Sequence, residues 1–343
     1  MTDHSITYKE SGVDIDAAAS AVDRIRGLAK KTFTPSVLSE VGGFGAMFSA
    51  DFKGIKTPVL VSSADGCGTK LKIAFLTQRH GSVGGDLVNH CINDIAVQGA
   101  HPLFFMDYIA TGRLNPDVIV SVVDGMSKAC LEAGFSLIGG ETAEMPGFYA
   151  EGEYDVAGFI VGVVDREKII DGRGVRPGDV LVGLPSVGLH TNGYSLARKL
   201  FFDISNFTVD TIIPELGIPL GDELLKPHVN YEPTLRASID AGLIQGLAHI
   251  TGGGITDNLV RILPSGCGAE VEIGSWPVLP LFKLMQKIGN IERDEMCRAT
   301  NMGIGMVAIV REESICEFNS LIGGAHYQIG RVVKGETTVA YLT

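Results

Sequence analysis

Basic residues are few in this chain, and no segment concentrates them. The sequence has 28 Lys and Arg residues against 40 Asp and Glu residues, which gives a formal net charge of -12. A surface that binds nucleic acid or an anionic membrane needs clustered positive charge, so we expect neither of these partners.

Segments that would direct the chain to a membrane are also missing. No apolar run approaches the roughly 20 residues that a membrane-spanning helix needs. The first residues, MTDHSITYKESGVDID, have neither the basic region nor the apolar region of a secretory signal. We therefore expect a cytoplasmic protein.

Two frequent signatures of functional sites are absent as well. The six cysteines are scattered and none forms a Cys-x-x-Cys pair, so there is no zinc-like cysteine spacing and reduced thiols are expected. The sequence contains neither a G-x-x-x-x-G-K-[ST] P-loop nor a G-x-G-x-x-G dinucleotide fingerprint. Any ATP site must therefore be of another kind.

Glycine, by contrast, is abundant, with 44 residues in a chain of 343, well above the usual share of about 7%. The glycines occur in discrete turns, where a backbone must adopt positive φ or approach another group closely. The length favours two domains. Gly, Arg and Pro are concentrated at Asp171–Gly178, between two segments that read as strands. This interruption predicts domains at residues 1–171 and 172–343.

Strands and helices alternate in both halves. In the first half the pattern predicts helices at 15–31, 82–98 and 116–133, and strands at 58–63, 102–108, 135–138 and 154–165. In the second half it predicts strands at 179–184, 303–310, 326–333 and 337–342, and helices at 194–202, 231–241, 279–288 and 312–322, with another opened by 249–255. The fold class is therefore α/β, or α+β with mixed sheets.

The segment after the first predicted strand carries the most suggestive chemistry. It reads Asp65, Gly66, Cys67, Gly68, Thr69, Lys70. A turn of this kind at a strand end presents bare backbone and charge to a phosphate group. We therefore expect this turn, including Lys70, to contact a phosphate.

The helix that follows has a polar stripe on an apolar background. Asp86, His90 and Asp94 are spaced four apart, and Asn89 and Asn93 lie on the same face. Burying so many polar groups is costly unless each has a partner. The stripe is either a satisfied internal network or the lining of a site for a hydrated divalent ion and a nucleotide.

Four further segments are candidates for binding. The loop Gly42, Gly43, Phe44, Gly45 could fold over a nucleotide, although a plain turn explains it equally well. Glu141 follows two glycines at a predicted strand end. Two turns, one with Asn192 and Gly193 and one with Thr251, Gly252, Gly253 and Gly254, precede helices and could bind an anion or simply cap the helix. His190, beside Thr191 in the first of these turns, is a candidate proton acceptor.

Taken together, these motifs resemble the phosphoribosylformylglycinamidine cyclo-ligases, also called aminoimidazole ribonucleotide synthetases, nearly from end to end. The resemblance rests on Tyr8–Asp16, Gly42–Ala46, Asp65–Lys70, Asn93–Asp94, Gly139–Gly147, His190–Ser195 and Thr251–Ile255. It departs mildly at Cys67, where valine is usual, and at Thr191, where serine is common. Neither change removes a charged group.

The resemblance implies a two-domain chain whose first domain forms a shared β-barrel in a homodimer, with ATP bound near that interface. Asp65, Asp94 and Glu141 would be the acids that hold Mg²⁺ and phosphate. Lys70 and the Gly42–Gly45 loop would contact the polyphosphate, and His190, Lys70 and Asp94 would be catalytic. Thr251–Gly254, with His190, Thr191, Asn192 and Gly193, would hold the ribose phosphate of the substrate.

The reaction implied is ATP-dependent ring closure of formylglycinamidine ribonucleotide to 5-aminoimidazole ribonucleotide. Related enzymes of the same superfamily are the alternatives. A selenophosphate synthetase would need a reactive cysteine in an early loop, and none precedes Cys67; a hydrogenase-maturation dehydratase would end in cysteine, whereas this sequence ends in Thr343. A thiamine-phosphate kinase would lack the His190–Ser195 turn in this form. A scaffold without turnover would be expected to have lost Asp94 or Glu141.

Overall fold

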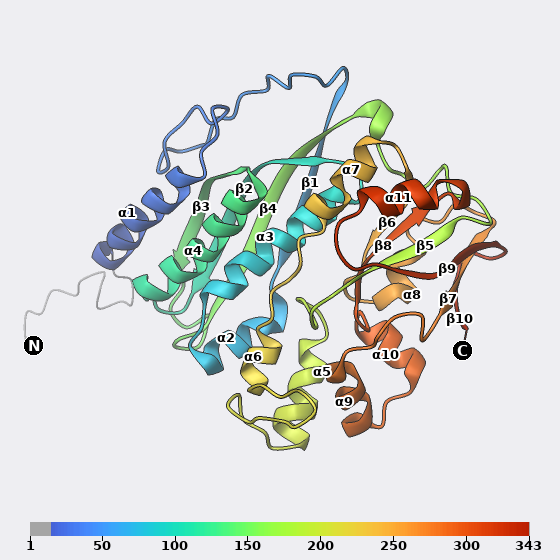
Figure 1. Ribbon diagram of the computed structural model, residues 1–343. Coiled ribbons are helices and arrows are strands. Elements are labelled where there is room, and N and C mark those ends of the chain that lie inside the picture. Colours follow the sequence, from blue (N-terminus) through green and yellow to red (C-terminus); the bar gives the residue numbers. More distant parts are fainter. Residues whose placement is uncertain (1–14, 343) are drawn as a thin grey trace, which may run out of the picture.

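The computed structural model describes residues 15–342, and it contains two β-sheets flanked by helices (Figure 1). Part of one motif that carries the resemblance, the Tyr8–Asp14 segment, lies outside these residues. The first sheet has the order β1-β4-β2-β3. Its strands are β1 (Pro58–Gly66), β2 (His101–Thr111), β3 (Ser136–Glu144) and β4 (Tyr154–Asp165). β4 is antiparallel to β1 and β2, and β2 is parallel to β3.

Helices α3 (Gly81–Ala96) and α4 (Pro116–Ala133) cover one face of this sheet, and α1 (Ile15–Lys31) packs beside α4 (Figure 1). Asn115 caps α4 by accepting from two backbone N–H groups, Pro116 occupies its first turn, and Gly134 ends it in the left-handed region. The backbones of α3 and α4 touch, since a Cβ at Gly84 would overlap the carbonyl oxygen of Val122. This close packing fixes α3, the helix that carries the polar stripe.

The second sheet has the order β10-β7-β9-β5-β8-β6. Its strands are β5 (Val180–Pro185), β6 (Ile244–His249), β7 (Cys267–Glu272), β8 (Ile304–Val310), β9 (Tyr327–Lys334) and β10 (Val339–Leu342). Strand β8, between β5 and the edge strand β6, is buried along its whole length, as its unbroken apolar sequence predicts. The fold is thus mixed α/β with two mixed sheets, as the sequence indicates.

Helices pack on both faces of the second sheet (Figure 1). On one face, α7 (Glu232–Asp240) and α11 (Ile315–Leu321) bury Leu235 and Phe318 against β5 and β8. On the other, α8 (Gly254–Leu259) buries Leu259 against the same sheet. The other α-helices of the second half are α5 (Tyr194–Arg198), α6 (Leu220–Leu224), α9 (Pro280–Gly289) and α10 (Arg293–Ala299), with a π-helical turn at Lys199–Ile204.

The predicted bounds of α1, α4 and β4 are confirmed, but several elements were missed. These are α2 (Leu71–Thr77), α6, β6, β7 and α10. The interval between the two sheets, after β4 and before β5, contains the predicted domain boundary at 171/172, which stays a prediction.

Two strand ends differ from the sequence prediction in a way that matters for the site. β1 continues to Gly66, so Asp65 lies within a strand, and β3 continues to Glu144, so Glu141 is also a strand residue. Gly140 explains the second difference, because a Cβ there would overlap the carboxylate of Asp107 on β2. Gly140 therefore makes room for a buried acid, and it lies within the strand with Gly139.

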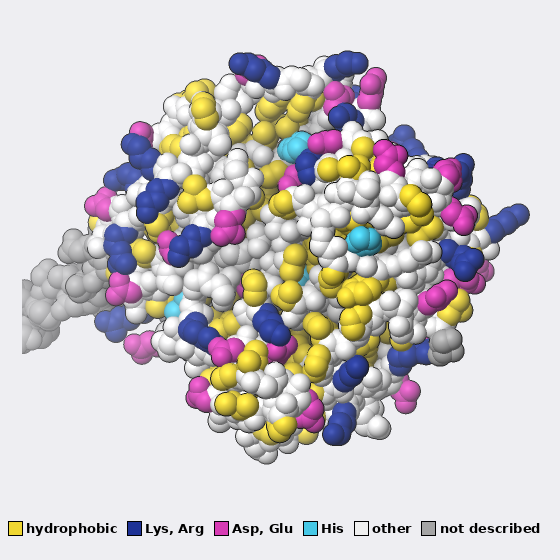
Figure 2. Space-filling view, in the orientation of Figure 1, with side chains coloured by type: hydrophobic (Ala, Val, Ile, Leu, Met, Phe, Trp, Pro, Cys, Tyr) yellow, Lys and Arg dark blue, Asp and Glu magenta, His cyan; other side chains and the backbone are white. Residues whose placement is uncertain are grey.

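The surface is mixed in charge. On the face drawn in Figure 2, basic and acidic side chains are interspersed, so that face has no basic track for a phosphate backbone. Among residues 15–342, no helix is both long and apolar enough to cross a membrane.

Candidate functional site

The polar stripe of α3 divides into two groups with different partners. One group clamps the segment that leads into α7: Asp86 accepts from the backbone N–H of His228 at 2.7 Å, and Asn89 donates to the His228 carbonyl at 2.8 Å. Asn93 accepts from the N–H of Tyr231 at 2.9 Å and donates to the Val229 carbonyl at 2.8 Å. For these three residues the satisfied internal network is the correct interpretation.

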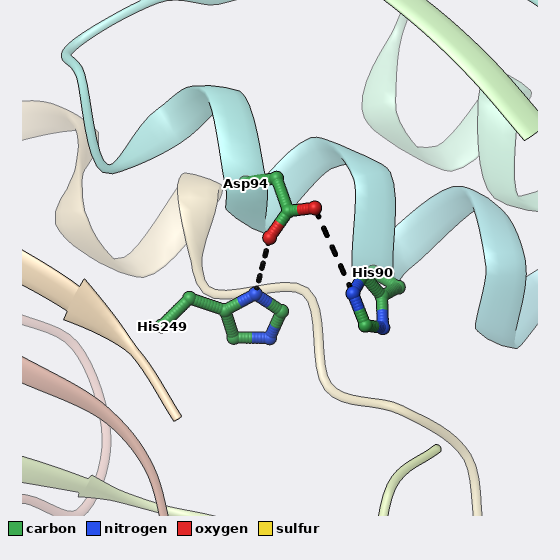
Figure 3. A group of neighbouring side chains, drawn as sticks. All are labelled: His90, Asp94 and His249. Atoms are coloured by element: carbon green, nitrogen blue, oxygen red, sulfur yellow. Dashed lines mark hydrogen bonds and ion pairs between the residues drawn. The ribbon is translucent and has the colours of Figure 1, made fainter. Parts of the chain in front are cut away.

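The other group, His90 and Asp94, meets His249 at the junction of the two sheets. Asp94 lies between the two imidazoles, one from α3 and one from the end of β6 (Figure 3). His249 Nδ1 is 2.8 Å from Asp94 Oδ1, and His90 Nε2 is 3.6 Å from Asp94 Oδ2. Ser63 of β1 donates to Asp94 at 2.9 Å, and Asp65 Oδ2 lies 2.7 Å from His90 Nε2. This group thus brings together Asp65 and Asp94, two of the acids predicted from sequence.

Behind these groups, the second nitrogen of each imidazole is also engaged. His90 Nδ1 is 2.8 Å from Thr191 Oγ1, and His249 Nε2 is 3.0 Å from His228 Nε2. His228 Nδ1 in turn lies 3.3 Å from Thr191 Oγ1. Four hydrogen bonds and the 3.6 Å approach of His90 to Asp94 thus form a ring of side chains that links the first half of the chain to the second.

The electrostatics of the ring favour ionised carboxylates. Burial raises the pKa of Asp65, but the hydrogen bond and charge of His90 outweigh it and leave that pKa below its ordinary value. Burial also raises the pKa of Asp94, but the hydrogen bond and charge of His249 outweigh burial and leave that pKa below its ordinary value. Both acids are therefore negatively charged at neutral pH.

The imidazoles of the ring differ from one another. Burial lowers the pKa of His90, but the hydrogen bond to Asp65 and the charge of Asp94 raise it overall. Burial lowers the pKa of His249, and its bond to Asp94 offsets only part of that effect. The pKa of His249 therefore lies below its ordinary value, whereas that of His90 lies above it.

The Asp65–Lys70 turn lies against the His190–Ser195 turn. The hydroxyl groups of Thr69 and Ser195 are 3.1 Å apart. Lys70, however, is completely buried: its Nζ is 2.6 Å from Asp86 Oδ2 and donates to the Lys226 carbonyl at 2.8 Å. The predicted phosphate contact of Lys70 is therefore corrected, because its ammonium is committed to an internal ion pair.

The two glycine turns of the second half lie side by side. A Cβ at Gly252 would sit 3.3 Å from Asn192 Oδ1, and Asn258 supports the turn by donating to the carbonyls of Gly252 and Gly254. Gly193 and Gly253 have φ of 82° and 96°, a left-handed backbone that favours glycine. The structure thus joins Asn192 to Gly252, as a common anion site requires.

His190 occupies a different environment from the one predicted. Its ring stacks on that of His228 with centroids 4.3 Å apart, and it is buried. Burial, with the charge of His249, holds the pKa of His190 well below its ordinary value. Neither ring nitrogen has a hydrogen-bond partner within residues 15–342. His190 thus packs behind His228, and its role as a proton acceptor stays a prediction.

The Gly42–Gly45 loop and Glu141 line a second site. They share a cavity of about 650 Å³ with α1, Asp107 and Tyr108. Asp107 is buried, and burial together with the charge of Glu141 raises its pKa to about 7. Phe44 is fully exposed in the loop.

Glu141 does not join Asp65 and Asp94 in one chain, which corrects the predicted three-acid cluster. Glu141 pairs with Tyr108, whereas Asp65 and Asp107 both pair with Gly158. Because strand neighbours alternate between faces, this one-residue offset puts Glu141 on the opposite face of the sheet from Asp65. It also lies three strand spacings away, roughly 14 Å at about 4.8 Å per spacing.

Sequence reasoning missed His249 and His228. His249 stands directly before the Ile250–Gly254 segment, so its position next to an anion turn was a usable signal. No sequence pattern marked His228, because its place in the ring depends on the hydrogen bonds that Asp86 and Asn89 of α3 make to its backbone.

Comparisons with known proteins give a consistent result. Family models described as AIR synthase related protein match residues 53–164 (N-terminal domain) and 176–342 (C-terminal domain). Curated relatives named phosphoribosylformylglycinamidine cyclo-ligase include one from Syntrophotalea carbinolica, 50% identical over 98% of each chain. Another, from Geobacter sulfurreducens, is 51% identical over 98% of this chain and 97% of its own.

Solved structures of lower identity share the fold. The hydrogenase maturation protein HypE of E. coli aligns with a TM-score of 0.68 at 17% identity, over 92% of each chain. Thiamine-monophosphate kinase from Stenotrophomonas maltophilia gives 0.66 at 18% identity, over 94% of this chain and 95% of its own. A HypE structure in complex with ATP gives 0.65 at 19% identity, over 92% of this chain and 88% of its own.

Proposed function

The chain belongs to the phosphoribosylformylglycinamidine cyclo-ligase family, and from that membership we propose how its residues share the work of the reaction. The enzyme uses ATP to close the imidazole ring of formylglycinamidine ribonucleotide, giving 5-aminoimidazole ribonucleotide, ADP and phosphate in de novo purine synthesis. The observation that carries this function is the identity of about half the residues over almost the whole chain.

The chemistry asks the protein mainly for positioning. The formyl oxygen is a poor leaving group until ATP phosphorylates it. The ribosylated amidine nitrogen then attacks the formyl carbon. The bond from this carbon to the phosphorylated oxygen breaks, phosphate leaves and a proton is released. Holding the two substrates in line and neutralising the phosphates supply most of the rate enhancement in reactions of this type.

We assign Mg²⁺ and the ATP phosphates to Asp65 and Asp94. The two side chains are partly exposed and ionised, and they meet at His90, which fits an ion that takes one or two carboxylates with phosphate oxygens. Bound there, Mg²⁺ would neutralise charge on the polyphosphate. Gly66, Gly68 and Thr69 would approach the phosphates, while Lys70 holds the turn in place through Asp86.

We assign the ribose phosphate of the substrate to Asn192, Gly193 and the Thr251–Gly254 turn. The closeness of Asn192 to Gly252 supports this assignment, because the two turns then lie at one place. His190 and Thr191 lie behind the turn, and we propose that they position the neighbouring histidines.

We further propose a homodimer in which the outward faces of the two first sheets meet as a shared barrel. Apolar side chains are exposed on that face: Leu60 is 62% exposed and Phe159 43%. Glu141 lies on the same face, so it and the Gly42–Gly45 loop would contact a nucleotide bound near the dimer interface. The cytoplasm is the expected location of this step.

The test is product formation by the purified chain. ADP and phosphate should appear with formylglycinamidine ribonucleotide, Mg²⁺ and ATP, and not when thiamine monophosphate or selenide replaces the purine precursor. Equal ADP formation with either substitute, and none with the precursor, would overturn the assignment.

A further inference from the structure

The ring at the junction of the two sheets contains two imidazoles, of His90 and His249, that the magnesium assignment does not use. His90, Asp94 and His249 each offer one ligand atom, and these atoms lie within 4.8 Å of one another (Figure 3). Bonds of about 2.0–2.2 Å to nitrogen and oxygen place the ligands of one ion roughly 3.4 Å apart in a tetrahedral site. The pairs at 2.8 and 3.6 Å already bracket this spacing.

The two imidazoles are oriented as ligating histidines are. A metal-bound histidine fixes its ring by bonding its other nitrogen to a neighbouring acceptor. His90 does so through Nδ1 to Thr191 at 2.8 Å, and His249 through Nε2 to His228 at 3.0 Å. His249 thus keeps Nδ1 directed at the carboxylate of Asp94, and His90 keeps Nε2 near the carboxylates of both Asp65 and Asp94.

The frame around these atoms is rigid and supplies a further oxygen. His90 and Asp94 are one helical turn apart on α3, whose backbone packs directly on α4. Asp65 Oδ2 lies 2.7 Å from the ligating nitrogen of His90. Two carboxylates and two imidazoles would therefore surround a dication with matching charge.

We propose that His90, Asp94 and His249, with Asp65 as a fourth ligand, bind a divalent transition metal ion such as Zn²⁺, Co²⁺ or Mn²⁺. Imidazole suits these ions, whereas Mg²⁺ takes oxygen ligands and keeps most of its water. The site shares Asp65 and Asp94 with the proposed magnesium site and in that respect rests on the proposed function. It binds its ion in the absence of ATP, because all four ligands come from the protein.

Cobalt reports this binding in the unaltered protein. After treatment with a chelator, the chain is titrated with Co²⁺ without ATP, and visible absorption is recorded. We expect d–d bands that saturate at one ion per chain, that one equivalent of Zn²⁺ abolishes and that millimolar Mg²⁺ leaves in place. Absence of the bands, or their loss on addition of Mg²⁺, would overturn the proposal.

Variants locate the ion. His249→Gln and His90→Gln should each weaken Co²⁺ binding by more than about a hundredfold, the upper range for loss of a supporting group alone. His326→Gln, remote from the ring and bonded to Asn319, is the matched control and should bind as the wild type does. Melting curves without metal show whether each variant is folded. Wild-type cobalt bands in both folded ring variants would place the ion elsewhere and refute the site.

The proposed function is tested separately on the same wild-type sample. Ring closure with Mg²⁺ and ATP but no cobalt bands would refute the metal proposal and leave the function standing. Cobalt bands with the expected displacement but no ring closure would support the site and count against the function.

Discussion

The ammonium of Lys70 lies 2.6 Å from the Oδ2 of Asp86, and both side chains are completely buried. Each partner also holds the backbone of the second half: Lys70 donates to the Lys226 carbonyl, and Asp86 accepts from the N–H of His228. The pair therefore fastens the segment that carries His228 into the ring. It links the two halves of the chain directly behind the candidate site.

Removing the cation of this pair should destabilise the fold. Lys70→Met leaves the Asp86 carboxylate buried without its partner, and breaking a buried pair in this way costs about 3–5 kcal/mol. Urea denaturation of the wild type and the variant measures the difference. Lys128→Met is the control, since Lys128 pairs with Asp124 at the same 2.6 Å on the surface and should matter little. A folded, equally stable Lys70→Met protein that has lost only ATP affinity would restore the phosphate role.

The proposed role of the Thr251–Gly254 turn in binding the substrate phosphate can be tested by adding a single methyl group at Gly252. Gly252→Ala places a Cβ 3.3 Å from Asn192 Oδ1, where the flexible amide can move aside, so the fold should be kept. Substrate phosphate would lose its close approach to the backbone, and the KM for the ribonucleotide should rise about tenfold, or 1.4 kcal/mol. The KM for ATP should change far less. Gly335→Ala, at a position with open space, is the control. Parallel increases in both KM values would mean that the turn does not bind the substrate phosphate.

The dimer proposal predicts which face is sensitive to charge. Leu60→Lys puts an ammonium on the outward face of the first sheet and should shift sedimentation at micromolar concentration from about twice the chain mass toward the monomer. Leu131→Lys, on α4 at 47% exposure, should leave the dimer intact. A wild-type chain that sediments as an active monomer would contradict both the interface and the place of Glu141 in the site.

Local signals in the sequence were enough to predict the longer helices α1, α3 and α4 but not to divide the polar stripe of α3. The apolar residues of α4 recur at helical spacing, and this local pattern predicts the bounds that the structure gives, Pro116–Ala133. The same helical period put Asp86 and Asp94 on one face, yet Asp86 meets a backbone N–H and Asp94 meets His249, 155 residues away. That contact depends on the packing of two sheets, which no local pattern encodes.

The prediction that Glu141 lies beside Asp65 and Asp94 was wrong for a related reason. Its distance from Asp65 depends on strand order, and its face depends on a register in which it pairs with Tyr108 and not with Asp107. A shift of one residue would reverse the outcome. The predicted strand ends at residue 138, before Gly140, whereas Gly140 makes room for the Asp107 carboxylate inside the sheet.

Asp94 provides the sharpest test of the site. Asp94→Asn keeps the size of the side chain, can still accept from His249 through its oxygen and can donate its amide N–H to Ser63, so the fold should survive. It removes a full negative charge from the place where Mg²⁺ and phosphate are proposed to bind. Turnover at saturating ATP and Mg²⁺ should fall roughly 10²-fold or more, the scale of losing one preorganised electrostatic contact.

The pH dependence of stability distinguishes this role from a structural one. The pKa of Asp94 in the folded chain is below its ordinary value of 3.8, since the bond from His249 outweighs burial. Its ionised form therefore stabilises the fold above pH 3.8, and this contribution disappears as the pH falls through the lower, folded-state pKa. Asp94→Asn should accordingly be somewhat less stable than the wild type at pH 7, and the difference should shrink in acid. Melting temperature and turnover are measured on one sample: near wild-type turnover with a melting temperature several degrees lower would make Asp94 a structural residue and remove the basis for the magnesium site.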